Sequence, residues 1–168
     1  ILLSISPFIF YILTFNNPYY SDDYGSILGV HLLNKIKNRN FLDISDLGVL
    51  RSDGHYNPVM YAIHNLIPPD ANLFHFVIVF LFLVSVYLTY FFLYKVSKNT
   101  KFAFISAFIF SVNFSLIIKP LVWNVFHSHI TNYFTAIISY IFFYYFIEKK
   151  NYIFVFAFIL FGALTVFN

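Results

Sequence analysis

Residues 72–94 read NLFHFVIVFLFLVSVYLTYFFLY, and this stretch contains no Asp, Glu, Lys or Arg. An α-helix needs about 20 predominantly apolar residues to cross the hydrocarbon core of a bilayer, so the stretch is long enough to do so. A basic turn, KVSKNTK at residues 95–101, follows at once. The pattern predicts a transmembrane helix that ends at the membrane surface.

The composition extends this prediction to the whole chain. Of its 168 residues, 60% are hydrophobic and only 10% are charged, whereas a soluble domain carries roughly 25% charged residues. Further hydrophobic stretches fall at 1–15, 102–118, 125–147 and 152–167. We therefore expect an all-α integral membrane protein, a polytopic helical bundle of about five transmembrane helices. With no cysteine, disulfides and thiolate chemistry are excluded.

The basic residues fall mostly in short turns between the hydrophobic stretches. The turn at 95–101 has three lysines, and EKK at 148–150 separates the last two stretches. Short loops rich in Lys and Arg stay on the cytoplasmic side of a membrane. Alternation then places residues 16–70 and 119–124 on the outer side. Topology thereby accounts for the net charge of +3, and we expect no nucleic-acid partner.

All six aspartates of the chain lie in the segment 16–70. Within it, Ser21-Asp22 is an N-cap signal, and apolar residues recur every four positions from Tyr24 to Ile36. A second helix is predicted to begin at Pro58, a favoured first-turn position. We expect both to be amphipathic surface helices of the first outer loop.

Asp22 and Asp23 form the first candidate site. At the membrane–water boundary a carboxylate accepts a proton from an incoming hydroxyl or amide, or helps to hold a divalent cation. In the alternative interpretation, Asp22 only caps the surface helix and Asp23 stabilises its first turn. The sequence leaves both open, and it leaves a metal cofactor open as well.

Arg51, His55 and Asn57 form a second polar cluster, just before Pro58. These side chains suit a phosphate or a sugar, because guanidinium, imidazole and amide groups donate hydrogen bonds to such oxygens. A hydrated turn, punctuated by Gly54 and Pro58, is the alternative.

Lys119, His127 and His129 form the third candidate, at the outer end of the stretch 125–147. Two residues apart on a helix, the histidines point about 200° away from each other, which disfavours a shared metal ion. We expect a polar helix end that faces the substrate. The remaining weak candidates are expected to be interfacial side chains: His31, His64 and His75.

In this order the features resemble the amino-terminal half of the GT-C superfamily of membrane glycosyltransferases. Within it they most resemble the branch of protein O-mannosyltransferases and lipid A aminoarabinose transferases. That family opens with one span and an acidic pair ahead of a surface helix, here YYSDDY at 19–24. The second surface helix starts with NPVMY at 57–61, one proline fewer than in the family. A small-residue stretch follows later, here GALT at 162–165.

The likeness of order and spacing covers nearly all of residues 1–168, which we expect to be the amino-terminal part of one longer transmembrane module. It implies an inverting transfer of a hexosyl or pentosyl group from a polyprenyl-phosphate-linked donor, on the outer face of a bacterial inner membrane. Asp22 matches the first acid of the pair, the proposed base or metal-associated residue, and Asp23 matches the second. Membrane lipids are the implied surroundings, and the acceptor is left open.

The sequence departs from the family pattern near the fourth span. The family often has an arginine and an acid there, whereas this chain has Lys119 and the two histidines. On the outer face, Arg51, His55 and Lys119 are the groups suited to stabilise a leaving lipid phosphate.

Two other classes of protein stay open. A non-catalytic membrane protein, such as a transporter or flippase-like protein, would carry ionisable groups near the middle of its spans. No Asp, Glu, Lys or Arg occupies such a position in the stretches 72–94, 102–118 or 125–147. A related membrane enzyme, such as a ligase or polymerase of surface polysaccharide, is the third class.

Overall fold

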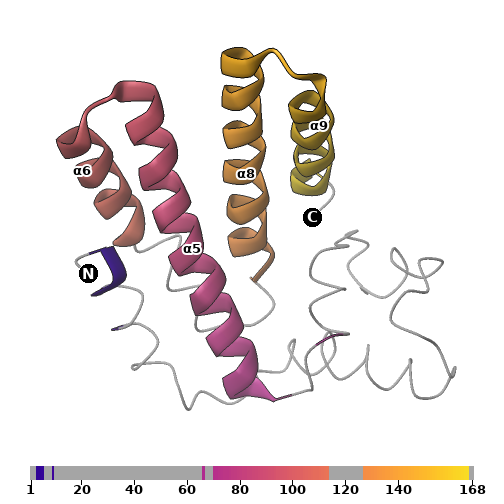
Figure 1. Ribbon diagram of the computed structural model, residues 1–168. Coiled ribbons are helices and arrows are strands. Elements are labelled where there is room, and N and C mark those ends of the chain that lie inside the picture. Colours follow the sequence, from indigo (N-terminus) through magenta and orange to yellow (C-terminus); the bar gives the residue numbers. More distant parts are fainter. Residues whose placement is uncertain (1–2, 6–8, 10–65, 67–69, 114–126, 167–168) are drawn as a thin grey trace, which may run out of the picture.

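The computed structural model describes residues 3–5, 9, 66, 70–113 and 127–166, and four helices make up most of these described residues (Figure 1). Within these residues every regular element is an α-helix: α5 (Ala71–Ser97), α6 (Thr100–Ser111), α8 (His127–Lys149) and α9 (Tyr152–Val166). They form two antiparallel hairpins, α5–α6 and α8–α9, and α5 packs against α8. The helices therefore stand in the order α6, α5, α8, α9.

The turn between α5 and α6 ends one helix and starts the next within two residues. Lys98 has the left-handed φ of 54°, and its N–H donates to Tyr94 O at 2.9 Å. Asn99 then caps α6, because its Oδ1 accepts from the N–H of Phe102 at 3.0 Å. Helices commonly end in this left-handed conformation, although glycine is the usual residue there.

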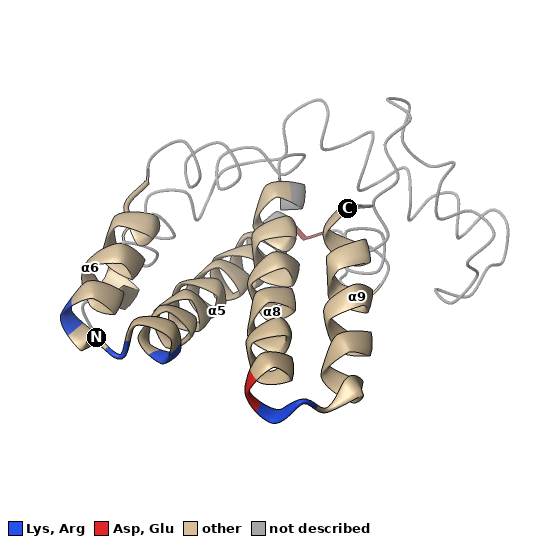
Figure 2. Cartoon of the chain, turned by 90° about the horizontal axis from the view of Figure 1, so that it is seen from above, with Lys and Arg blue, Asp and Glu red and all other residues tan. Residues whose placement is uncertain are grey.

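The turn between α8 and α9 has the same design. Lys150 has a φ of 55°, and its N–H donates to Phe146 O at 2.8 Å. Asn151 Oδ1 accepts from the N–H of Ile153 at 3.0 Å. Each hairpin is thus closed by a Lys-Asn pair, and both turns lie at the same end of the bundle (Figures 1 and 2).

The apolar core lies where α5, α6 and α8 meet. Phe110 of α6 connects them: its ring is 5.8 Å from that of Phe82 in α5 and 5.8 Å, edge to face, from that of Tyr133 in α8. Close packing of such rings adds to the stability gained by burying them. The core residues come from all three helices and from the short helical segment 3–5: Leu3, Ile78, Val79, Phe82, Val86, Ala107 and Ile130.

The outward faces of the bundle carry large apolar side chains. Phe80 of α5, Ile109 of α6 and Phe156 of α9 are 54%, 60% and 69% exposed. Apolar surface of this extent is unfavourable in water and suits a hydrocarbon environment. In the described part of the chain, two segments are long and apolar enough to cross a membrane, His75–Ser97 and His129–Lys149.

The predicted spans 72–94 and 125–147 correspond to α5 and α8, and the span 152–167 corresponds to α9. The span 102–118 differs, because α6 ends at Ser111. There Ser111 Oγ donates to Phe108 O at 2.8 Å, and the N–H of Asn113 donates to Phe110 O at 3.3 Å. Side chains and turns of this kind compete with helix propagation.

Length limits what the two shorter helices can span. The 12 residues of α6 extend about 18 Å and the 15 residues of α9 about 22 Å, against a hydrocarbon core of about 30 Å. Two of the five predicted spans therefore meet the length requirement within the described residues. The span 1–15 is described only at residues 3–5 and 9, and the surface helices only at Leu66, all helical.

Candidate functional site

The candidate site belongs to the end of the bundle opposite the two Lys-Asn turns. At this end α5 and α8 begin and α6 and α9 finish (Figure 1). We call it the histidine end and define it by Asp70, Asn113 and His129. Asp70 is the N-cap of α5, and its Oδ1 accepts from the N–H of Leu73 at 3.0 Å. Asp70 thereby has a structural role.

Most of the predicted site residues lie outside the described part of the chain. This applies to Asp22, Asp23, Arg51, His55, Asn57 and Lys119. Their assignment to one site rests on the order of motifs in the sequence. His31 and His64 lie outside the described residues too.

The two histidines of the third candidate begin α8. His127 is the first residue of the helix, and His129 follows in its first turn. His129 is exposed, whereas Ile130 and Thr131 next to it are 1% and 0% exposed. The side chain of His129 therefore faces away from the helix interface.

His75 corrects one sequence prediction. It was expected at the membrane interface, but it is fully buried within the bundle. Its position explains this, since His75 shares one helical stripe with Ile78, Val79 and Phe82 of the core. Nearly all of the neighbouring residues on the other faces of this stretch are apolar too, so the spacing alone does not single out this stripe in the sequence.

Hydroxyl groups that the sequence analysis did not single out line the inner side of α8. Thr131, Thr135 and Ser139 are spaced by four residues and are at most 4% exposed. Thr135 Oγ1 donates to Thr131 O at 3.0 Å, within the helix. Ser139 Oγ reaches across to α9 and donates to Phe158 O at 3.0 Å. The four-residue spacing is again visible in the sequence.

The GALT stretch at 162–165 on α9 lies against Thr135 and Ser139 of α8. Thr165 Oγ1 lies 2.9 Å from Thr135 Oγ1. A Cβ added to Gly162 would meet Ser139 Oγ at 3.4 Å, so α8 and α9 approach closely at this point. Small residues and interhelical hydroxyl bonds hold helices together in membranes, where apolar burial provides little drive.

Ser85, Thr89 and Ser111 bond within their own helices, whereas the hydroxyl of Tyr87 in α5 lies 2.7 Å from Ser4 Oγ. Ser85 Oγ donates to Leu81 O and Thr89 Oγ1 donates to Ser85 O, both at 2.8 Å. In α6, Ser111 bonds to Phe108 O. Such back-bonding satisfies a buried hydroxyl without a ligand or a water. These groups therefore have a structural explanation.

The charges of the described residues are strongly separated between the two ends. All five lysines of this part of the chain lie in or beside the two turns, together with Glu148, whereas Asp70 lies at the histidine end (Figure 2). The first turn also contacts α8, because Lys98 Nζ and Lys95 O each lie 3.5 Å from the hydroxyl of Tyr144. We call this the lysine end. The predicted placement of both basic turns on one side of the bundle is consistent with this geometry.

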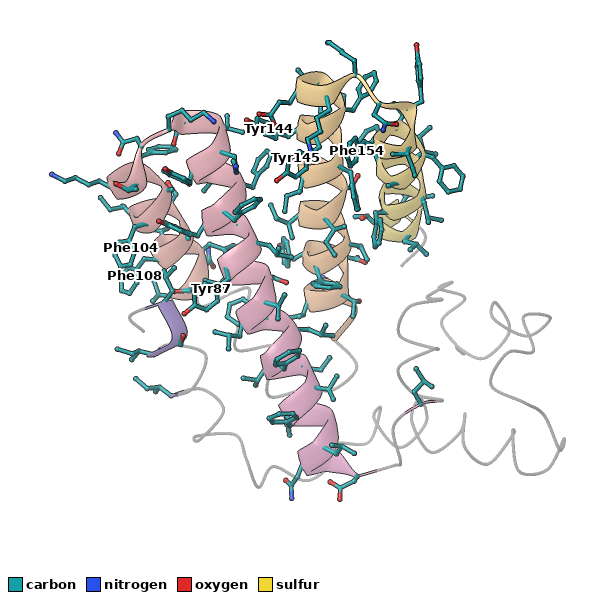
Figure 3. All side chains as sticks on the ribbon, viewed as in Figure 1. Tyr87, Phe104, Phe108, Tyr144, Tyr145 and Phe154 are labelled. Atoms are coloured by element: carbon teal, nitrogen blue, oxygen red, sulfur yellow. The ribbon has the colours of Figure 1, made fainter. Side chains whose placement is uncertain are left out.

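Aromatic side chains surround the lysine end (Figure 3). Tyr144 and Tyr145 pack edge to face with their ring centroids 5.8 Å apart. Tyr145 also packs on Phe154 of α9 at 5.7 Å. Tyrosines at a helix end beside lysines are typical of the headgroup level of a membrane.

Comparisons with protein-family models, with curated proteins and with solved structures find none that matches this chain.

Proposed function

We propose that the chain is part of a membrane glycosyltransferase that uses a polyprenyl-phosphate-linked sugar on the outer face of a bacterial inner membrane. One observation carries the proposal: the acidic pair Asp22-Asp23 stands between the first hydrophobic stretch and a predicted surface helix. The motif at 57–61 and the basic turns follow in the order found in the GT-C superfamily.

The difference in charge between the two ends of the bundle supports the proposed orientation of the chain in the membrane. Both lysine turns lie at one end, where short basic loops mark the cytoplasmic side. Asp70 and His129 lie at the other end. The described helices meet residues 16–70 and 114–126 at this end, and we propose that the candidate groups of both segments lie on this side.

In the proposed reaction Asp22 acts as the general base. Its carboxylate takes the proton of the acceptor hydroxyl or amide while the acceptor atom forms a bond to the anomeric carbon of the sugar. The bond from that carbon to the phosphate oxygen breaks, and the oxygen keeps the electron pair. Arg51 and Lys119 supply positive charge for the leaving phosphate. Attack opposite the leaving group inverts the anomeric carbon.

The membrane location has its own support. Apolar side chains cover the outward faces of the helices, and α5 and α8 are long enough to cross a bilayer. A transporter would be expected to expose polar groups inside its spans. The hydroxyls of Ser85, Thr89 and Ser111 each bond to a carbonyl of their own helix. The sequence argues for the enzyme, because no Asp, Glu, Lys or Arg lies near the middle of the stretches 72–94, 102–118 and 125–147.

The test compares Asp22→Asn with Asp70→Asn in the full chain, assayed for sugar transfer from membrane lipid extracts. Loss of the base should lower the rate by about 100-fold or more. Asp70→Asn is the matched control, because asparagine also caps a helix, and it should retain the activity. Transfer by Asp22→Asn at the wild-type rate, at a normal protein level, would remove Asp22 from the mechanism. Flux through proteoliposomes without a glycosylated product would favour a transporter.

A further inference from the structure

The lysine end concentrates positive charge away from the proposed catalytic side. It has Lys95, Lys98 and Lys101 around the first turn and Lys149 and Lys150 at the second. With Glu148 as the one acid in the two turns, the formal charge is +5 − 1 = +4. The charge comes from both hairpins, which lie far apart in the sequence and meet only in the folded chain (Figure 2).

Three of these lysines place their ammonium groups over the aromatic ring four residues earlier in the chain. Lys95 Nζ lies 5.5 Å from the ring centre of Phe91, and Lys149 Nζ lies 5.3 Å from that of Tyr145. Lys150 Nζ lies 6.0 Å from that of Phe146. These cation–π contacts place the ammonium groups at the level of the aromatic side chains, which is the headgroup level if α5 and α8 cross the membrane.

The junction between the hairpins has spare hydrogen-bonding capacity. The contact from Lys98 Nζ to the hydroxyl of Tyr144 is 3.5 Å long, at the limit of a hydrogen bond. An ammonium group has three donors, and Lys98 and Lys101 are exposed. A phosphate oxygen placed here would meet the ammonium group of Lys98 in the first hairpin beside the hydroxyl of Tyr144 in the second.

We propose that the lysine end binds the headgroups of anionic phospholipids of the phosphatidylglycerol kind, and that this contact ties the two hairpins together. Anionic lipids concentrate beside clusters of lysines at the cytoplasmic ends of transmembrane helices. The proposal rests on the proposed membrane insertion and is independent of the sugar transfer.

The test uses the full chain in micelles of a neutral detergent. Dioleoyl phosphatidylglycerol or dioleoyl phosphatidylcholine is added, and the unfolding temperature is measured. The anionic lipid should raise the unfolding temperature and the zwitterionic lipid should not. The double variant Lys98→Gln/Lys101→Gln should lose at least half of the shift, whereas Lys98→Arg/Lys101→Arg should keep it.

A charge-matched control tests whether the lipid-induced rise in unfolding temperature depends on the lysine end or only on the net charge of the protein. Lys35→Gln/Lys37→Gln removes the same charge from the segment 16–70 and should keep the full shift. Equal shifts with both lipids, or an unchanged shift in Lys98→Gln/Lys101→Gln, would overturn the proposal. So would an equal shift with inorganic phosphate alone, which would make the ligand a free anion. If the glutamine variant does not fold, Tyr144→Phe should weaken the anionic-lipid shift, and a full shift would count against the proposal.

Discussion

The hydroxyl oxygens of Thr135 and Thr165 lie 2.9 Å apart and join the middle of α8 to the last turn of α9. The contact sits beside the close approach of Gly162 to Ser139. Together these contacts hold α9, none of whose residues is fully buried. The second hairpin thus combines these polar and small contacts with aromatic pairs between α8 and α9, such as Phe142–Phe161 at 5.7 Å and Phe143–Phe158 at 5.1 Å.

Thr165→Val should weaken this hairpin, because it removes the interhelical hydroxyl and keeps the size of the side chain. We expect a loss of about 0.5–1 kcal/mol in the free energy of unfolding, measured by denaturation in mixed micelles. Thr89→Val is the control, since Thr89 bonds only to Ser85 of its own helix, and it should have a smaller effect. A Thr165→Val protein as stable as the wild type would show that the contact contributes nothing.

Gly162 should tolerate alanine and reject leucine. An added Cβ meets Ser139 Oγ at 3.4 Å, an ordinary contact, and alanine is the better helix former by up to about 1 kcal/mol. A leucine would push α9 away from α8 and should cost about 1–3 kcal/mol. In a double-mutant cycle, Ser139→Ala and Gly162→Leu should show a coupling energy. Purely additive effects would mean that the two positions do not touch.

The left-handed lysines should be replaceable by glycine with a gain in stability. Lys98 and Lys150 have φ values of 54° and 55°, a conformation that costs a residue with a Cβ about 1 kcal/mol. Lys98→Gly should therefore raise the unfolding temperature. Lys98→Gln removes the same charge but keeps the unfavourable backbone, so it should bring no such gain. If Lys98→Gly and Lys98→Gln had the same unfolding temperature, the change would come from the lost charge and not from the backbone conformation.

The two ends of the bundle should be labelled from opposite sides of the membrane. The chain has no cysteine, so single cysteines report their positions cleanly. Asn113→Cys and Tyr24→Cys should react with a membrane-impermeant maleimide in intact cells. Ser97→Cys, at the lysine end, should react only after the membrane is opened. Labelling of Tyr24→Cys only after opening would contradict the proposed outer location of the acidic pair.

The positions of the long helices could be predicted from local sequence. Hydrophobic length and the lysines that interrupt it are properties of short stretches, and they predict α5 and α8 to within a few residues. The end of α6 could not be predicted in this way, because it depends on bonds of Ser111 and Asn113 to their own helix. Of the candidate site, the structure describes the backbone at His127 and the exposed side chain of His129.

By itself, the sequence determined the helical class, the boundaries of the long apolar helices and the charge of the turns, because each depends on neighbouring residues. Only the tertiary structure decided that His75 is buried, that Thr135 meets Thr165 and that both lysine turns share one end. The reason is physical. These helices are apolar on nearly every face, and lipid and protein core are almost equally apolar, so hydrophobicity does not indicate which face packs inward. That choice is made by small residues, hydroxyls and ring shapes, which act only when two helices meet.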